Sequence, residues 1–114
     1  MEFIIFLSKL DKEIVDLVKK ASYSIKENSS ICLINKNYIG FHNRGEKLIV
    51  ICTENAKKIT NFREKKLLNN NDNQKTKLYI KKALRHEATH MAQSCNNNKI
   101  IGNIENIKKR LNKN

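Results

Sequence analysis

The stretch Tyr79-Ile-Lys-Lys-Ala-Leu-Arg-His-Glu-Ala-Thr-His-Met91 has the most regular helical pattern in the chain. One stripe recurs every three or four positions and consists of Ile80, Leu84, Glu87 and Met91. The neighbouring stripe consists of Tyr79, Ala83, His86 and His90. Outside both fall Lys81, Lys82, Arg85 and Thr89. The pattern predicts a helix from about Asn73 to Ser94, whose wide inner face contains one glutamate and two histidines.

Within this helix, His86-Glu-Ala-Thr-His90 matches the motif H-E-x-x-H. Its spacing stacks two imidazoles one turn apart on one helix face, where both can reach a single Zn²⁺ ion. Glu87 then stands where it can take a proton from a metal-bound water. We therefore expect His86 and His90 to bind zinc and Glu87 to act as a general base. The alternative is that both histidines are ordinary core or surface residues.

A catalytic zinc ion usually has a third protein ligand, and no motif identifies one here. The candidates, besides water, are Glu105, Cys95, His42 and Gln93. Each also has an ordinary interpretation: Glu105 as a solvated helix residue, His42 as part of an exposed polar turn, and Cys95 or Cys52 as a small buried apolar residue. A contact or disulfide between Cys52 and Cys95 is a further alternative.

The other secondary-structure elements are predicted from apolar spacing and turn residues. Ser8 and Asp11 have the spacing of a capping box before a helix from Lys9 to Lys26. Short apolar runs predict strands at Ile31–Ile34 and Lys47–Cys52. Further helices are expected over Ala56–Leu68, capped by Asn55, and after Gly102, with a polar break at Asn69–Asp72. The apolar positions of the last helix are Ile101, Ile104, Ile107 and Leu111.

These elements predict an α+β fold in which a small antiparallel sheet packs against the H-E-x-x-H helix. At 114 residues the chain has room for a single domain spanning 1–114. The edge of Lys47–Cys52 could hold a peptide by strand addition, although an ordinary core strand explains the same residues.

A longer stretch, from Ile39 to Cys95, resembles a known peptidase family. The matching segments, in order, are Ile39-Gly-Phe41, Leu48-Ile-Val-Ile-Cys52, Glu54-Asn55 and Leu84-Arg-His-Glu-Ala-Thr-His-Met-Ala-Gln-Ser-Cys95. This order resembles the mitochondrial inner-membrane metallopeptidase family that matures an ATP synthase subunit. The resemblance implies a minimal zincin fold, zinc ligation by His86 and His90, catalysis by Glu87, and amide hydrolysis of a peptide or protein substrate.

Two departures limit what the resemblance implies. Gln93 stands where the family tends to have aspartate, and the family's cysteine-rich upstream portion has no counterpart here. Cys52 and Cys95 match family positions without gaining a role. The resemblance therefore assigns neither a substrate nor a membrane association, and a catalytically inactive zinc-binding module remains an alternative to the peptidase.

The chain is strongly basic, with a formal net charge of +12 and a pI near 9.8. This charge makes a small nucleic-acid-binding protein the other alternative. However, 19 of the basic residues are Lys and only 4 are Arg, and the Lys residues are scattered from Lys9 to Lys113. Specific readers of nucleic acid favour Arg forks and clustered stripes. We therefore expect a solvated surface without specific nucleic-acid binding.

The sequence also bears on the compartment. Phe3–Leu7 is too short for the apolar region of a signal peptide, and no apolar run reaches the length of a membrane span. Three cysteines, Cys32, Cys52 and Cys95, are an odd number without the spacing of a disulfide framework. A reducing, cytoplasmic environment is therefore expected.

Overall fold

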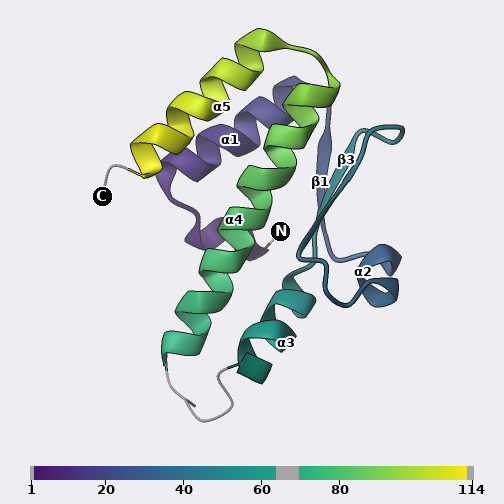
Figure 1. Cartoon of the computed structure of the whole chain (residues 1–114), viewed down its shortest axis with the longest axis vertical. Coiled ribbons are helices and arrows are strands. Elements are labelled where there is room, and N and C mark those ends of the chain that lie inside the picture. The colour runs from purple at the N-terminus through teal and green to yellow at the C-terminus, as the bar shows by residue number, and fades with distance from the viewer. Residues whose placement is uncertain (1, 64–69, 113–114) are drawn as a thin grey trace.

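The computed structural model describes residues 2–63 and 70–112, which form an α+β fold around one long helix (Figure 1). In chain order the elements are a 3₁₀ helix η1 (Glu2–Phe6), α1 (Lys9–Lys20), β1 (Ser24–Glu27), α2 (Ser30–Ile34), β2 (Gly40–Asn43), β3 (Leu48–Ile51), α3 (Thr53–Arg63), α4 (Asn70–Ser94) and α5 (Asn98–Leu111). Helix α4 contacts α1, α3 and α5 as well as β2 and β3. The H-E-x-x-H residues thus lie on the helix that joins the helical part to the sheet.

The sheet has the strand order β1-β3-β2 and is mixed. β1 runs parallel to β3, with Ile25 opposite Ile49, whereas β2 runs antiparallel to β3, with His42 opposite Ile49. The predicted antiparallel sheet is therefore wrong for β1. The predicted strand at Lys47–Cys52 is confirmed as β3, but it lies in the centre of the sheet and has no free edge. The free edges of this sheet belong to β1 and β2.

The first helix begins as predicted and ends earlier. The Ser8 hydroxyl caps α1 by accepting a hydrogen bond from the Asp11 N–H at 3.1 Å. The helix stops at Lys20, because Ser22 adopts a left-handed conformation with φ of 66°. The residues up to Lys26 then form β1 instead of a further helical turn. Ile25 keeps its inward position by pairing with β3, so apolar spacing alone did not separate helix from strand.

The predicted strand at Ile31–Ile34 is wrong, because these residues form the short helix α2. Two tertiary interactions hold it. Cys32 forms a disulfide with Cys52 at the end of β3. The buried Asn55 side chain donates hydrogen bonds from Nδ2 to the carbonyls of Cys32, Asn35 and Tyr38, at 2.9, 3.2 and 2.9 Å. Asn55 therefore lies inside α3 and fixes the preceding segment, rather than capping the helix.

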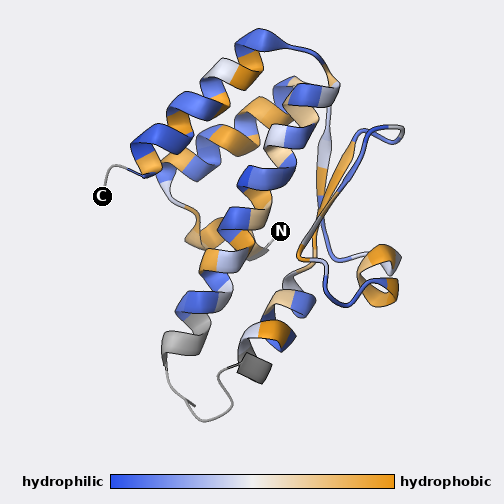
Figure 2. Ribbon diagram, viewed as in Figure 1, coloured by the Kyte–Doolittle hydropathy of each residue, from blue (hydrophilic) through white to orange (hydrophobic). Residues whose placement is uncertain are grey.

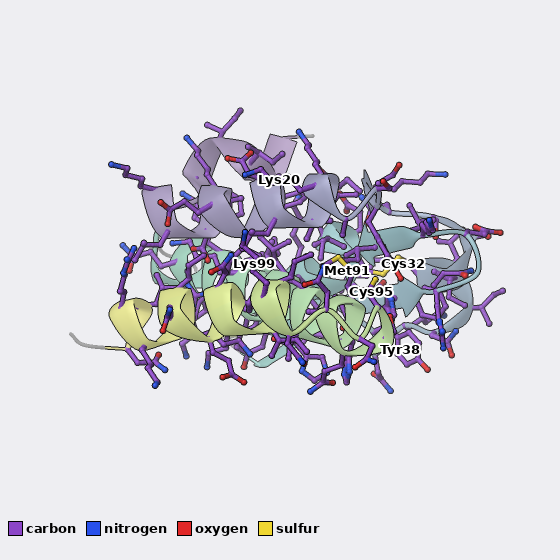
Figure 3. The ribbon with its side chains drawn as sticks, turned by 90° about the horizontal axis from the view of Figure 1, so that it is seen from above. Lys20, Cys32, Tyr38, Met91, Cys95 and Lys99 are labelled. Carbon is purple, nitrogen blue, oxygen red and sulfur yellow. A yellow bond between two sulfur atoms is a disulfide. The ribbon has the colours of Figure 1, made fainter. Side chains whose placement is uncertain are left out.

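The disulfide also corrects the expectation for the cysteines. Cys52 is bonded to Cys32 and not to Cys95, which is an exposed free thiol. Figure 3 labels Cys32 and Cys95 and draws the disulfide as a yellow bond. Two of the three cysteines are thus paired across 20 positions of sequence, which the spacing rule did not anticipate.

The remaining helices differ from prediction mainly at their ends. α4 begins at Asn70, so most of the expected polar break at Asn69–Asp72 is helical, while residue 69 and the expected end of the preceding helix at Leu68 lie outside the described residues. α5 begins at Asn98, before Gly102, because the Asn97 side chain accepts a hydrogen bond from the N–H of Ile100 and caps it.

The main hydrophobic core lies between α4, α1, α5 and one face of the sheet. Ile80, Leu84 and Met91 of the predicted inner stripe are buried there, as expected. The opposite face of the sheet carries a smaller cluster around Cys32, Val50 and Cys52. Figure 2 shows α2 as mostly hydrophobic, and its Leu33 and Ile34 are 74% and 76% exposed. The sheet therefore has two differently covered faces, of which the better covered one faces α4.

A buried ion pair connects α1 to α4. Arg85 donates from Nε and Nη2 to the two carboxylate oxygens of Asp11, at 2.8 and 3.1 Å. The Asp11 side chain is fully buried, and Ser8 donates a further hydrogen bond to it. Arg85, expected outside the packed face, thus anchors the helix that carries the motif.

Among residues 2–63 and 70–112, no helix combines the length and the apolar character needed to cross a lipid bilayer.

Replacing Arg85 with alanine should lower the free energy of unfolding by about 3–5 kcal/mol, because the Asp11 carboxylate would stay buried without its partner. Urea denaturation followed by circular dichroism measures the loss. Glu54→Ala is the control, since Glu54 pairs with Lys57 at 61% and 58% side-chain exposure, and it should cost less than about 1 kcal/mol. Equal small losses in both variants would contradict a structural role for the buried pair.

Candidate metal centre

Both histidines of the motif lie on the exposed side of α4. Their Nε2 atoms are 2.9 Å apart and the rings meet edge to face, with centroids separated by 4.3 Å. The prediction that the inner face holds two histidines and a glutamate is therefore wrong for the histidines and confirmed for Glu87, which is 8% exposed. The row formed by His86 and His90 borders the packed face without entering it.

The convergence of the two rings fits a metal ion. Two nitrogens bound to one tetrahedral zinc ion at about 2.0–2.1 Å would be about 3.3 Å apart. The observed separation of 2.9 Å is near this value, so the two Nε2 atoms already lie about as close together as two ligands of one ion. In the structure one Nε2–H donates to the other Nε2. His86 and His90 could thus hold an ion after a small opening of the pair.

Glu87 is held between α4 and the start of β2. A β-carbon built on Gly40 would lie 2.8 Å from Cγ and 2.9 Å from Oε2 of Glu87, and 3.2 Å from Cβ of Ala83. Only a residue without a side chain allows this approach. Burial raises the pKa of Glu87, and the charges of His86 and His90 oppose the rise. The raised pKa makes this carboxylate a stronger base than a solvated one.

A groove runs along α4 to this glutamate. Its volume is about 510 Å³, and its walls come from α4 and from the segment that leads into β2. The residues that line it include Tyr38, Gly40, Tyr79, Ala83, His86 and Glu87. The Asn55 hydrogen bond to the Tyr38 carbonyl fixes one wall. The groove is therefore lined by His86 of the motif and by the buried Glu87 carboxylate.

His42, one of the candidate third ligands, lies on β2, the strand that approaches α4 at Gly40. It lies half-buried in β2, not in an exposed turn, and its Nε2 is 3.0 Å from the Tyr23 hydroxyl. Burial lowers the pKa of His42, with further lowering by the charges of His90 and Arg44. Tyr23 belongs to no sequence motif, so its contact with His42 becomes visible only from the pairing of the strands.

The other candidate ligands lie apart from the histidine pair. Glu105 is exposed on α5, Gln93 is exposed near the end of α4, and Cys95 follows that helix as an exposed thiol. Among the described residues, no three His, Cys, Asp or Glu side chains lie close enough together to hold a metal ion. The structure thus brings His86 and His90 into contact, with Glu87 on the same helix and His42 on the neighbouring strand β2.

Gly40→Ala should destabilise the protein, because the new methyl group must displace either the Glu87 side chain or the strand; about 1–3 kcal/mol is the usual cost of such overpacking. Removing the obstacle in Gly40→Ala/Glu87→Ala should recover part of the loss, as urea titrations of the four proteins in this cycle would show. Gly102→Ala is the control: nothing lies within 4 Å of its added β-carbon, and alanine favours a helix by about 0.5–1 kcal/mol. A Gly40→Ala protein as stable as the parent would refute the close contact.

One protein family matches almost the whole chain. The family described as a domain of unknown function, DUF8637, matches residues 3–114. Neither the curated proteins nor the solved structures contain a match to the chain. The family match extends over both strands of the hairpin and the whole of α4. The chain therefore belongs to the DUF8637 family.

Proposed function

We propose that this protein is a zinc-dependent peptidase of the minimal zincin type, with His86 and His90 as metal ligands and Glu87 as general base. The observation that carries the proposal is the convergence of the two Nε2 atoms, 2.9 Å apart, on the helix that also presents Glu87 to the groove. Two imidazoles and one carboxylate in this order are the groups that metal-assisted amide hydrolysis requires. The resemblance of Ile39–Cys95 to a metallopeptidase family supports the same function.

The chemistry divides between the ion and the protein. A zinc ion at these histidines supplies Lewis acidity, which polarises a carbonyl group and makes water easier to deprotonate. Glu87 takes the proton from the attacking water and delivers it to the nitrogen of the leaving amine. Its raised pKa suits both steps, because a carboxyl group with a pKa nearer neutrality accepts a proton more readily and still releases it.

The outer edge of β2 provides a way to hold a peptide. Cys52 donates to the Ile39 carbonyl at 2.7 Å, so Ile39 and Cys52 form a hydrogen-bonded pair. Such pairs alternate along an antiparallel ladder, which directs the N–H and C=O groups of Gly40 and His42 away from β3. An extended chain in the groove could bond to these groups. The strand-addition site is therefore proposed at β2 and not at Lys47–Cys52.

The metal is tested first. Purified protein should contain about one zinc per chain by elemental analysis, and His86→Ala or His90→Ala should abolish it, because a single imidazole is a weak site. Glu87→Gln should keep the zinc and lose proteolysis of unfolded proteins or peptide libraries, since an amide accepts no proton. Glu105→Gln is the matched control: it removes an exposed carboxylate from α5 and should retain activity.

The outcomes separate the alternatives. Protein that holds no zinc and takes up none on titration would rule out the peptidase. Zinc binding without activity in either the parent or the Glu87→Gln protein would leave a zinc-binding module. Activity retained in Glu87→Gln would remove Glu87 from the mechanism.

A further inference from the structure

The contacts around Tyr23 engage Nε2 of His42 and leave its Nδ1 without a hydrogen-bond partner among the described residues. The Ser94 hydroxyl donates to the Met91 carbonyl at 3.0 Å, so its oxygen is left to accept from the Tyr23 hydroxyl at 3.5 Å. The Tyr23 hydroxyl lies 3.0 Å from Nε2 of His42 and accepts from that nitrogen when the ring proton is on Nε2. In that tautomer Nδ1 keeps its lone pair, and this is the tautomer that a metal ion bound at Nδ1 would select. The stacked Tyr23 and His42 rings, with centroids 5.5 Å apart, hold this arrangement.

His42 is presented on the same side of the sheet as the candidate metal centre. In a strand, residues two apart share a face, so His42 lies on the face of Gly40, which touches Glu87. The partner of Tyr23, Ser94, lies one helical turn after His90 on α4. Two imidazoles of α4 and one of β2 therefore lie on the same side of the helix, although as they lie they do not surround one point.

We propose that His42 is the third protein ligand of this centre and binds the metal ion through Nδ1. The inference rests on the proposed metal site at His86 and His90. Metal binding requires the side chains to move, because no three potential ligands lie close together among the described residues. The His86–His90 hydrogen bond is exchanged for the ion, and the ring that donates from Nε2 moves its proton to Nδ1. No proton is gained or lost by the three neutral imidazoles.

The surroundings of His42 are those of a metal ligand. A ligating histidine usually donates its other N–H to a fixed acceptor, which orients the ring and selects its tautomer. The Tyr23 hydroxyl is placed to be such an acceptor, at 3.0 Å from Nε2 of His42, and Ser94 Oγ lies 3.5 Å from the same hydroxyl. Three histidines also leave a fourth position for water, which is the arrangement of a catalytic rather than a structural zinc site. Glu105, by contrast, has no hydrogen-bond or ion-pair partner among the described residues.

The test measures metal affinity and does not depend on catalysis. Zinc is titrated into the metal-free full-length protein against a chromophoric chelator, and Co²⁺ is used to record the absorption spectrum of the bound ion. His42→Gln is the main variant, because its amide N–H can still donate to Tyr23 while the imidazole lone pair is gone. We expect zinc affinity to fall more than about 100-fold and the Co²⁺ spectrum to change, since loss of a ligand exceeds the 10–100-fold cost of losing an outer partner.

Two further variants serve as comparisons for His42→Gln. Tyr23→Phe removes the acceptor of His42 and should weaken zinc binding by about 10–100-fold with little change in the Co²⁺ spectrum. Asn43→Ala, at the next position of β2 and on its other face, should bind zinc like the parent. Circular dichroism checks the fold of each variant. Should His42→Gln not fold, His42→Cys replaces it, and its Co²⁺ complex should show the intense charge-transfer absorption of a thiolate ligand.

The contradicting outcomes are distinct. Parent-like zinc affinity and an unchanged Co²⁺ spectrum in His42→Gln, or a His42→Cys complex without thiolate absorption, would overturn the assignment of His42 and leave the proposed function standing. A parent protein that binds no metal would overturn the proposed function itself.

Discussion

The close approach of β2 to α4 at Gly40 is the contact on which the candidate site depends. A side chain at this position would collide with Glu87, so glycine lets the strand lie directly against the helix. The approach buries the carboxyl group beside the backbone of β2, which raises its pKa through loss of solvation. It also brings His42, two residues further along the strand, to the side of α4 that carries His90. The absence of a side chain at Gly40 therefore determines both the raised pKa of Glu87 and the position of His42 relative to α4.

Rigid supports keep this contact in place from both sides. On the helix side, the buried Asp11–Arg85 pair fixes α4 against α1 within the turn that precedes His86. On the strand side, the Cys32–Cys52 disulfide and the Asn55 hydrogen bonds hold the segment that leads into Gly40. A functional centre needs such supports, because loosely held groups lose the geometry on which metal binding and proton transfer depend.

Local signals in the sequence were enough to predict some of these elements. The cap at Ser8, the strand β3 and the course of α4 follow from hydrogen-bonding side chains and apolar spacing within a few residues. β1 and α2 could not be predicted in this way. Ile25 fits a helical stripe and a strand equally well, and pairing with Ile49 decides between them. The run at Ile31–Ile34 resembles a strand, but a disulfide and a distant amide hold it as a helix.

The candidate site likewise combines features that local sequence predicts with features that depend on tertiary structure. The motif fixes the spacing of His86, Glu87 and His90, yet it says nothing of their surroundings, so the histidines were expected inside and lie outside. Tyr23 and His42 meet only because β1 and β2 both pair with β3, which no local pattern encodes.

The Asn55 amide has a consequence for the chemical ageing of the protein. One NH₂ group faces three carbonyl oxygens, so each of these contacts requires a donor. Spontaneous deamidation of Asn55 would replace that donor with a carboxylate, which only accepts hydrogen bonds and would repel all three oxygens. A change of a single mass unit would thus release the groove wall at Tyr38. Burial of Asn55 within a helix keeps the backbone from the conformation that this reaction needs, so the fold protects the atom on which it relies.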